Sequence, residues 1–246
     1  GGRFADVEDT LRVAASMAEH CDILDVGGES TRPGAEDVAK TEEIARTAPV
    51  IEAMRRAGVQ VPISIDTRKG PVAEAALSAG ANIVNDVSAF TFDPSLAGIV
   101  AEAGVPVVLM HAQGTPDTMQ EAPSYADVVL DVYDHLAERI AFAEAAGISR
   151  QTIAIDPGIG FGKTQEHNLA LLRNLSLFHG LGCPILLGVS RKGFIGRIGG
   201  AQSPADRMPG SLAVGLLALG QGVQILRVHD TVEHAQALRL WEAIHP

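Results

Sequence analysis

Short apolar runs recur along the chain, and each of them ends in a polar residue. The runs are rich in β-branched residues and mostly uninterrupted by charge, which is typical of strands buried on both faces. They cover residues 23–26, 63–65, 83–84, 107–110, 153–155, 185–189 and 225–228. Between them, apolar residues lie three and four positions apart, a spacing that indicates helices with one buried face. The chain is therefore predicted to alternate strands and helices.

Three of the predicted helices have candidate caps. The clearest one is expected to begin with Ser124 as its N-cap and to end with Gly147 as its C-cap. The last helix is expected to start at Asp230, with Glu233 placed as in a capping box. Asp6 is the expected N-cap of the first helix.

The polar residues that close the apolar runs are regularly spaced. They are Asp25, Asp66, Asn85, His111, Asp156, Ser190 and His229. Their mean separation of about 34 residues is the length of one βα unit, and no linker interrupts the series. We therefore expect residues 1–246 to form a single domain.

Seven strands do not close the usual parallel barrel. The chain opens Gly1-Gly2-Arg3-Phe4, like the middle of a loop, and then continues into a helix. We therefore expect one more strand before Gly1, which would give an α/β fold of the (β/α)₈ TIM barrel class. An open doubly wound sheet is the alternative, but no GxGxxG motif follows any predicted strand.

The composition excludes several classes of function. With 46% hydrophobic and 20% charged residues, the chain can form a full core, which excludes a disordered protein. The formal net charge of −11 argues against a nucleic-acid or anionic-membrane partner. An anionic substrate would have to be bound by a few concentrated Arg and Lys residues. Cys21 and Cys183 have no metal or disulfide spacing, so a cytoplasmic location is expected.

The strand ends carry two chemically different sets of side chains. Asp66, Asn85 and Asp156 offer acceptors suited to a flat, nitrogen-rich ring such as an amino-substituted pterin or guanine. A cationic set suits phosphate or carboxylate and comprises Arg32, Lys192, Arg227 and His229. In the alternative interpretation, the cations pair with the aspartates as a structural network, and each polar residue only caps a helix. A ligand site and such a network are compatible.

A glycine-rich segment over residues 158–164 resembles a phosphate-binding P-loop at its Gly-Lys-Thr end. Pro157 stands where the first glycine of that motif is required, so ATP hydrolysis is not expected. The segment is better interpreted as a turn that brings backbone close to a ligand.

Several segments together resemble the dihydropteroate synthase family of folate biosynthesis. Residues 25–34, DVGGESTRPG, are similar almost letter for letter to that family's second-strand signature. Later family motifs are matched in order by SIDT at 64–67, NDVS at 85–88, MH at 110–111, QGTP at 113–116, DPGIGFGK at 156–163, SRK at 190–192 and RVHD at 227–230. The resemblance covers the chain from end to end.

The resemblance implies a (β/α)₈ barrel that joins 6-hydroxymethyl-7,8-dihydropterin pyrophosphate to 4-aminobenzoate and releases pyrophosphate. It implies that the pterin is held by Asp66, Asn85, Asp156 and Lys192. It implies that the pyrophosphate is held by Arg227, His229 and the mobile-loop residues Thr31 and Arg32. The 4-aminobenzoate, whose position sulfonamides occupy in the family, would be bordered by Pro33, Phe161 and Ser190. Lys192, Arg227 and His229 are the expected catalytic residues, Mg²⁺ the expected cofactor, and a homodimer the expected assembly.

One part of the family pattern is not matched. In the family, an Asn-x-Thr-Pro-Asp-Ser-Phe motif on the first strand supplies an Asn that contacts the metal, and this chain begins just beyond it. The metal ligands are therefore left unassigned, the natural protein is expected to extend further at its N-terminus, and a chain without that segment is expected to be inactive.

Two rival functions remain open from the sequence alone. A methyltransferase barrel that passes a folate methyl group to a corrinoid would share the three acceptors, but it would not need the cationic set. The second rival is a non-catalytic relative that keeps the barrel as a binding module.

Overall fold

The computed structural model describes residues 7–31, 34–114, 118–119 and 121–245. Within these residues the chain alternates short parallel strands with helices, as the sequence predicts. The strands are β1 (Leu24–Gly27), β2 (Ile63–Asp66), β3 (Ile83–Asp86), β4 (Val107–Met110), β5 (Ile153–Asp156), β6 (Leu186–Leu187) and β7 (Ile225–Leu226).

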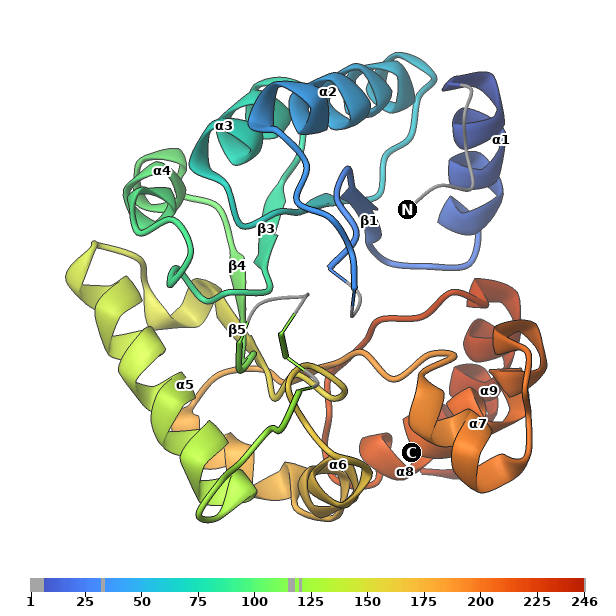
Figure 1. Cartoon of the computed structure of the whole chain (residues 1–246). Helices are drawn as coiled ribbons and strands as arrows, with labels where there is room; N and C mark the ends of the chain where they lie inside the picture. The colour runs from blue at the N-terminus through green and yellow to red at the C-terminus, as the bar shows by residue number, and fades with distance from the viewer. Residues whose placement is uncertain (1–6, 32–33, 115–117, 120, 246) are drawn as a thin grey trace.

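Helices follow the strands and form the outer layer. They are α1 (Val7–Ala18), α2 (Lys40–Arg56), α3 (Gly70–Ser78), α4 (Ser95–Ala103), α5 (Val128–Ala145), α6 (Gln165–Arg173), α7 (Gly193–Gly199), α8 (Met208–Leu219) and α9 (Thr231–Ile244). Short 3₁₀ helices within the described ranges cover Arg150–Thr152, Leu175–Leu181 and Pro204–Arg207. Figure 1 shows the helices surrounding the strands. None of the helices among the described residues is long and apolar enough to cross a lipid bilayer.

The strands are arranged in chain order. Strands β1 to β5 form one parallel sheet, and β6 pairs in parallel with β7. A parallel bridge between Ile155 and Ile185 connects the two sheets. The register places Asp66 opposite Asn85, and Met110 opposite Asp156, so the polar ends of neighbouring strands lie level. This is the arrangement of an α/β barrel, the predicted class; the strand expected before Gly1 lies outside the described residues.

The core between strands and helices is built from the predicted apolar faces. On the strands, Ile65, Leu109 and Ile155 are fully buried. On the longest outer helix, α5, Leu136 and Ile140 face them at helical spacing and are also buried. The helices therefore cover one face of the sheet and leave the strand ends to form a rim.

Strands β6 and β7 are shorter than predicted. The apolar runs over 185–189 and 225–228 predict four or five residues, but the ladder covers two in each strand. The run after Leu187 leaves the strand at Gly188 and turns, with the Lys192 N–H donating to the Val189 carbonyl at 3.1 Å. Ile225 and Leu226 are only half-buried, so the expectation of two buried faces is wrong for β7.

Two of the three predicted N-caps can be checked. Helix α5 is capped by Asp127, whose carboxylate accepts from the N–H groups of Val129 and Leu130, and the prediction of Ser124 is wrong. Ser124 lies three residues earlier, where its N–H donates to Gln113 Oε1. Asp230 does precede α9, but its side chain caps nothing and no capping box forms.

The remaining boundaries of these helices agree more closely with the sequence. The C-cap of α5 is Ala146, and the expected Gly147 follows it with a left-handed φ of 98°. Asp6 lies outside the described residues.

Candidate active site

Polar side chains from every described strand meet at one rim. Asp66, Asn85 and Asp156 belong to the last two residues of their strands, and Asp25 lies within β1. The other members come one to five residues after their strands. Because parallel strands end at the same edge, these side chains share one mouth of the barrel. The members of this rim are Asp25, Asp66, Asn85, His111, Asp156, Ser190, Lys192, Arg227 and His229.

Arg227 connects the cationic and acceptor sets. Its Nε lies 2.5 Å from Asp25 Oδ2, and its Nη2 lies 2.6 Å from Asp66 Oδ2. The amide of Asn85 donates to the same Asp25 oxygen at 3.4 Å. The pairing of cations with strand-end aspartates, considered from the sequence, is therefore present for Asp25 and Asp66.

Burial shapes the charges of this cluster. Burial raises the pKa of Asp66 to about 7, and the nearby guanidinium of Arg227 opposes the rise. The charge of Asp25 raises the pKa of Arg227, so its guanidinium stays protonated. Burial also raises the pKa of Asp156, against the opposing charge of Lys192. The protonated guanidinium of Arg227 thus lies near Asp66 and Asp156, two buried carboxylates with raised pKa values.

Lys192 and Phe161 lie together. The Lys192 ammonium donates to the Ile159 carbonyl and lies 4.6 Å from the centre of the Phe161 ring. Burial lowers the pKa of Lys192 to about 8, although the charge of Asp156 acts in the other direction. An aromatic face and a cation are therefore placed side by side at the ends of β5 and β6.

Ser190 and His229 are also brought together. The His229 N–H donates to Ser190 Oγ at 3.2 Å, and the Nδ1 atom of His229 lies 3.0 Å from the same oxygen. Ser190 is buried, whereas His229 is exposed at the mouth. Of the predicted loop residues, Thr31 is half-buried after β1, and Arg32 and Pro33 lie outside the described residues.

The base of the loop after β1 is held by an ionic network that the sequence did not indicate. Glu29 accepts from the Val38 N–H at 2.8 Å, from Arg68 Nε at 3.0 Å and from Lys69 Nζ at 2.8 Å. Lys69 Nζ also lies 3.0 Å from Glu43 Oε2. Burial by itself raises the pKa of Glu29, but the hydrogen bonds outweigh it and lower the pKa to about 2. Only the position of Arg68 and Lys69 just after Asp66 could have drawn attention to this network.

His111 is used inside the protein. Its Nδ1 lies 2.8 Å from the Nζ atom of buried Lys163, which also donates to the Phe161 carbonyl at 3.0 Å. Burial lowers the pKa of His111 to about 2, and the charge of Lys163 adds to that effect. Neutral His111 therefore helps to hold the segment that carries Phe161.

The glycine-rich turn after Asp156 packs tightly on the β4 side of the rim. A Cβ at Gly158 would lie 1.8 Å from the His111 carbonyl oxygen, and one at Gly162 would lie 2.3 Å from the Gln113 carbonyl oxygen. Both glycines have a left-handed φ, of 70° and 64°. The predicted close approach is thus made to neighbouring backbone.

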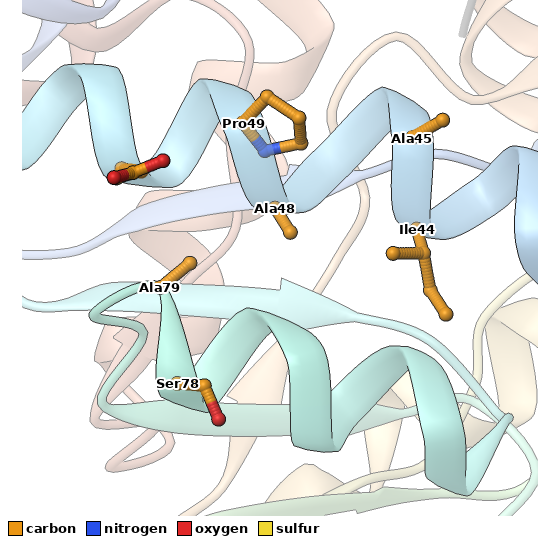
Figure 2. Close-up of a pocket in the computed structure, with 7 residues that line it drawn as sticks. Ile44, Ala45, Ala48, Pro49, Ser78 and Ala79 are labelled. Atoms are coloured by element: carbon orange, nitrogen blue, oxygen red, sulfur yellow. The ribbon is translucent and has the colours of Figure 1, made fainter.

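One groove lies on the helical layer, away from the rim. Figure 2 shows a groove of about 380 Å³ between α2 and α3, which contains none of the predicted site residues. It is lined by Ile44, Ala45, Ala48, Pro49, Glu52, Ser78 and Ala79. Among the residues that the structure describes, no group of three or more His, Cys, Asp or Glu side chains is placed to hold a metal ion.

Comparison with known proteins assigns the chain to a defined family. The family model described as pterin binding enzyme matches residues 1–229. The dihydropteroate synthase of Escherichia coli K12 is 44% identical over 244 residues, which cover 99% of this chain and 86% of that protein.

Solved structures agree with the sequence relatives. A Yersinia pestis dihydropteroate synthase in a sulfonamide drug complex superposes with a TM-score of 0.96 at 39% identity, covering 100% of this chain and 88% of that one. A Xanthomonas albilineans dihydropteroate synthase in complex with 7,8-dihydropteroate gives a TM-score of 0.88 at 41% identity, covering 100% and 87%. The chain therefore belongs to the dihydropteroate synthase family of pterin-binding barrel enzymes.

Proposed function

We propose that this chain condenses 6-hydroxymethyl-7,8-dihydropterin pyrophosphate with 4-aminobenzoate at the strand-end rim, giving 7,8-dihydropteroate and pyrophosphate. The observation that carries the proposal is the contact of one cation, Arg227, with an acceptor carboxylate, Asp66. A substrate with a nitrogen-rich ring and a pyrophosphate tail requires hydrogen-bond acceptors for the ring and cations for the pyrophosphate within a short distance of each other. The Xanthomonas relative solved with 7,8-dihydropteroate supports the same reaction.

Each part of the substrates is assigned to one group of residues. The acceptors that hold the pterin ring are Asp66, Asn85 and Asp156, joined by Lys192. The groups that hold the pyrophosphate are Thr31, Arg32, Arg227 and His229. The 4-aminobenzoate is bordered by Pro33, Phe161 and Ser190. The contact of Ser190 with His229 supports neighbouring sites for the nucleophile and the leaving group.

The chemistry is a substitution at the exocyclic methylene of the pterin. The carbon–oxygen bond to pyrophosphate breaks, and a carbon–nitrogen bond to the aniline amine forms, after which that amine loses a proton to solvent. Because positive charge develops on the pterin and negative charge on pyrophosphate, the barrier is mainly charge separation. Lys192, Arg227 and His229 are the proposed catalytic residues, since prealigned cations stabilise the departing anion.

The aniline nitrogen is neutral and nucleophilic near pH 7, so the reaction requires no strong general base. Carboxylates at the ring, such as Asp156, favour the developing pterin cation. These two requirements account for a site that combines carboxylates near the pterin ring with cations near the pyrophosphate.

Mg²⁺ remains a prediction. The described residues present no metal-binding cluster, so we derive no step of the reaction through a metal ion. Calorimetric titration of pyrophosphate into the protein, with MgCl₂ and with EDTA, measures the expected gain in affinity. Equal affinity under both conditions would contradict a role for Mg²⁺ in binding the anion.

The function is tested by assaying pyrophosphate release from dihydropterin pyrophosphate with and without 4-aminobenzoate. The natural gene product, including any segment that precedes Gly1, is the appropriate protein. We expect release that depends on 4-aminobenzoate, with 7,8-dihydropteroate identified by mass. Binding of pterin without release would instead indicate a non-catalytic pterin-binding protein.

We also propose a single-domain, cytoplasmic homodimer. Helix α8 is apolar on most of its surface, and Leu217 is 70% exposed there. On the adjacent α9, Leu240 and Ile244 are 60% and 70% exposed. Burying these side chains against a second copy would stabilise the assembly. Sedimentation equilibrium of the wild type and of Leu217→Glu tests this proposal, and a wild-type monomer would contradict it.

A further inference from the structure

The turn after β6 has an unusual residue at its centre. The Lys192 N–H donates to the Val189 carbonyl, so residues 189–192 form a four-residue turn. Arg191 is the third residue of that turn and has a φ of 58°, a left-handed conformation usually supplied by glycine at this position. Such a conformation persists in another residue only where surrounding contacts hold it.

The backbone of Arg191 is held by the start of α8. Its N–H donates to Ser211 Oγ at 2.8 Å, and its carbonyl accepts from Arg207 Nη1 at 3.0 Å. Ser211 is fully buried, and its hydroxyl in turn donates to the Arg207 carbonyl at 2.9 Å. The strained peptide is therefore fixed on one side by a buried hydroxyl and a guanidinium.

The side chain of Arg191 is held by the loop after β7. Its guanidinium forms two contacts with Asp230, one of them from Nε to Oδ2 at 2.9 Å. The two side chains are only 18% and 12% exposed, which makes this pair better shielded than a surface ion pair. The hydrogen bond from Arg191 lowers the pKa of Asp230. Asp230 stands at the N-cap position of α9, and its carboxylate binds Arg191 and does not cap the helix.

This ion pair connects two loops beyond the end of the strand ladder. The register of β6 and β7 ends at the pair Leu187–Leu226, and both loops continue toward the rim. Ser190 and Lys192 flank Arg191 on one loop, and His229 precedes Asp230 on the other. Side chains therefore set how these two loops lie relative to each other.

We propose that Arg191 is a positioning residue of the pyrophosphate site. Its pair with Asp230 sets Ser190 and Lys192 in place relative to His229, so that the cations converge on one anion. Because Arg191 points toward Asp230, its two neighbours can point into the mouth. This inference rests on the proposed function and adds a residue that acts through others.

The test measures binding of inorganic pyrophosphate by calorimetry, together with turnover. Arg191→Ala removes the pair and keeps an unfavourable φ, whereas Arg191→Gly removes the pair and accepts that φ freely. Asp230→Asn removes the charge from the other side. We expect all three variants to weaken pyrophosphate binding by about 10-fold or more and to lower kcat/KM at least as much. Arg191→Lys, which keeps one charged contact, should lie between them and the wild type.

A control comes from an arginine–carboxylate pair at the opposite end of the barrel, whose side chains are more exposed, at 47% and 38%. Arg150, just before β5, contacts Glu144 through Nε at 2.9 Å and Nη2 at 2.7 Å. Arg150→Ala should therefore leave pyrophosphate binding and turnover unchanged. An equal effect of Arg150→Ala and Arg191→Ala would overturn the proposal.

A double-mutant cycle distinguishes positioning from general stabilisation. If Arg191 acts through its neighbours, Arg191→Ala should weaken pyrophosphate binding much less in a His229→Ala background than in the wild type. Multiplicative effects, unchanged binding in Asp230→Asn, or a binding loss that parallels the fraction unfolded would overturn it. Because binding is measured directly, wild-type protein that binds pyrophosphate without turnover would contradict the proposed function and still test Arg191.

Discussion

Asp156 shows how one side chain in the site combines two tasks. Its Oδ1 accepts the Gly158 N–H at 2.7 Å, which fixes the following turn. Its charge also faces that of Lys192, and burial of the pair makes every unmatched polar contact costly. Substitutions at this residue therefore need to separate its role in the turn from its proposed role in binding the pterin.

Asp156→Asn should weaken pterin binding and preserve the fold. The amide oxygen can still accept from Gly158, but its NH₂ group would face the donor edge of the ring. We expect a loss of about 1–3 kcal/mol in pterin affinity, measured by calorimetry. Asp156→Ala is the control that also removes the acceptor for Gly158, and it should lower the melting temperature further. Unchanged pterin binding in Asp156→Asn would refute the assignment.

Lys192 should give the reaction an alkaline limit. Burial lowers its pKa to about 8, so its charge is lost as the pH rises through that value. Affinity for dihydropterin pyrophosphate should then fall above about pH 8. Lys192→Arg keeps its charge and should lack this limb, even if its absolute affinity is lower. Superimposable pH profiles of the two proteins would contradict the prediction.

At the scale of elements, the rim depends on loops held by interactions that differ in kind. The turn after β5 is fixed by close backbone packing, because Gly158 lies directly against His111. The loop after β1 is fixed by charge, because Glu29 accepts from two cations and a backbone N–H. These two loops should therefore respond differently to substitution and to pH.

Gly158→Ala should be far more destabilising than Gly160→Ala. Both glycines have a left-handed φ, of 70° and 86°, so the conformational cost of a side chain is similar, about 1 kcal/mol. At Gly158 a Cβ would lie 1.8 Å from a backbone oxygen, whereas at Gly160 the nearest atom is Lys192 Cδ at 3.4 Å. We expect a further loss of about 3 kcal/mol or more at Gly158, measured by urea unfolding. Equal losses would show that the turn can move away from His111.

Glu29→Gln should lower stability most at neutral pH and clearly less in acid. Glu29 titrates near 4.5 in the unfolded chain and near 2 in the folded one, so its contribution is present above about pH 4.5. That contribution is lost as the pH falls toward 2. Allowing for solvent screening, we expect a difference of about 2 kcal/mol at pH 7. Urea unfolding at pH 7 and at pH 3 checks it; a difference independent of pH would contradict it.

The sequence predicted the elements better than it predicted their contacts. Apolar runs place all seven strands, because burial between helices requires them, and the strand-end rule then places Asp66 and Asn85 together. The same reasoning failed at Ser124, since Asp127, closer to the first helical residue, makes the cap. It also missed the hydrogen bond from Lys69 to Glu29, because no local spacing signals a contact across 40 residues.

At the scale of the whole molecule, Arg227 connects the last described strand to the first two. It follows β7 and binds the carboxylates of Asp25, within β1, and of Asp66, at the end of β2, contacts that span 202 and 161 residues of sequence. Among the described residues no strand pairing joins β7 to β1. The guanidinium therefore holds this side of the rim together and also belongs to the proposed anion site.

Arg227→Ala should impair both catalysis and stability. Loss of one prealigned charge should reduce turnover by about 10²–10³-fold, and Arg227→Lys should also be impaired, because lysine cannot bind two partners in a planar arrangement. Burial raises the pKa of Asp66 to about 7, and the charge of Arg227 limits that rise. Without Arg227 the pKa of Asp66 rises further, and this destabilises the folded protein only at a pH where Asp66 is ionised. The melting temperature should accordingly fall more at pH 8 than at pH 5. A loss of turnover without this pH-dependent destabilisation would show that the pairs with Asp25 and Asp66 contribute little.

The shared guanidinium also has a consequence for selectivity among cellular anions. Any anion that approaches Arg227 competes with two carboxylates already in contact with it. Chloride, with a single charge, gains little by displacing them, whereas a pyrophosphate ester offers several charges and pairs of oxygens that can accept two hydrogen bonds from one guanidinium. We therefore expect Asp25 and Asp66 to weaken the binding of common monovalent anions to Arg227 more than the binding of a pyrophosphate ester.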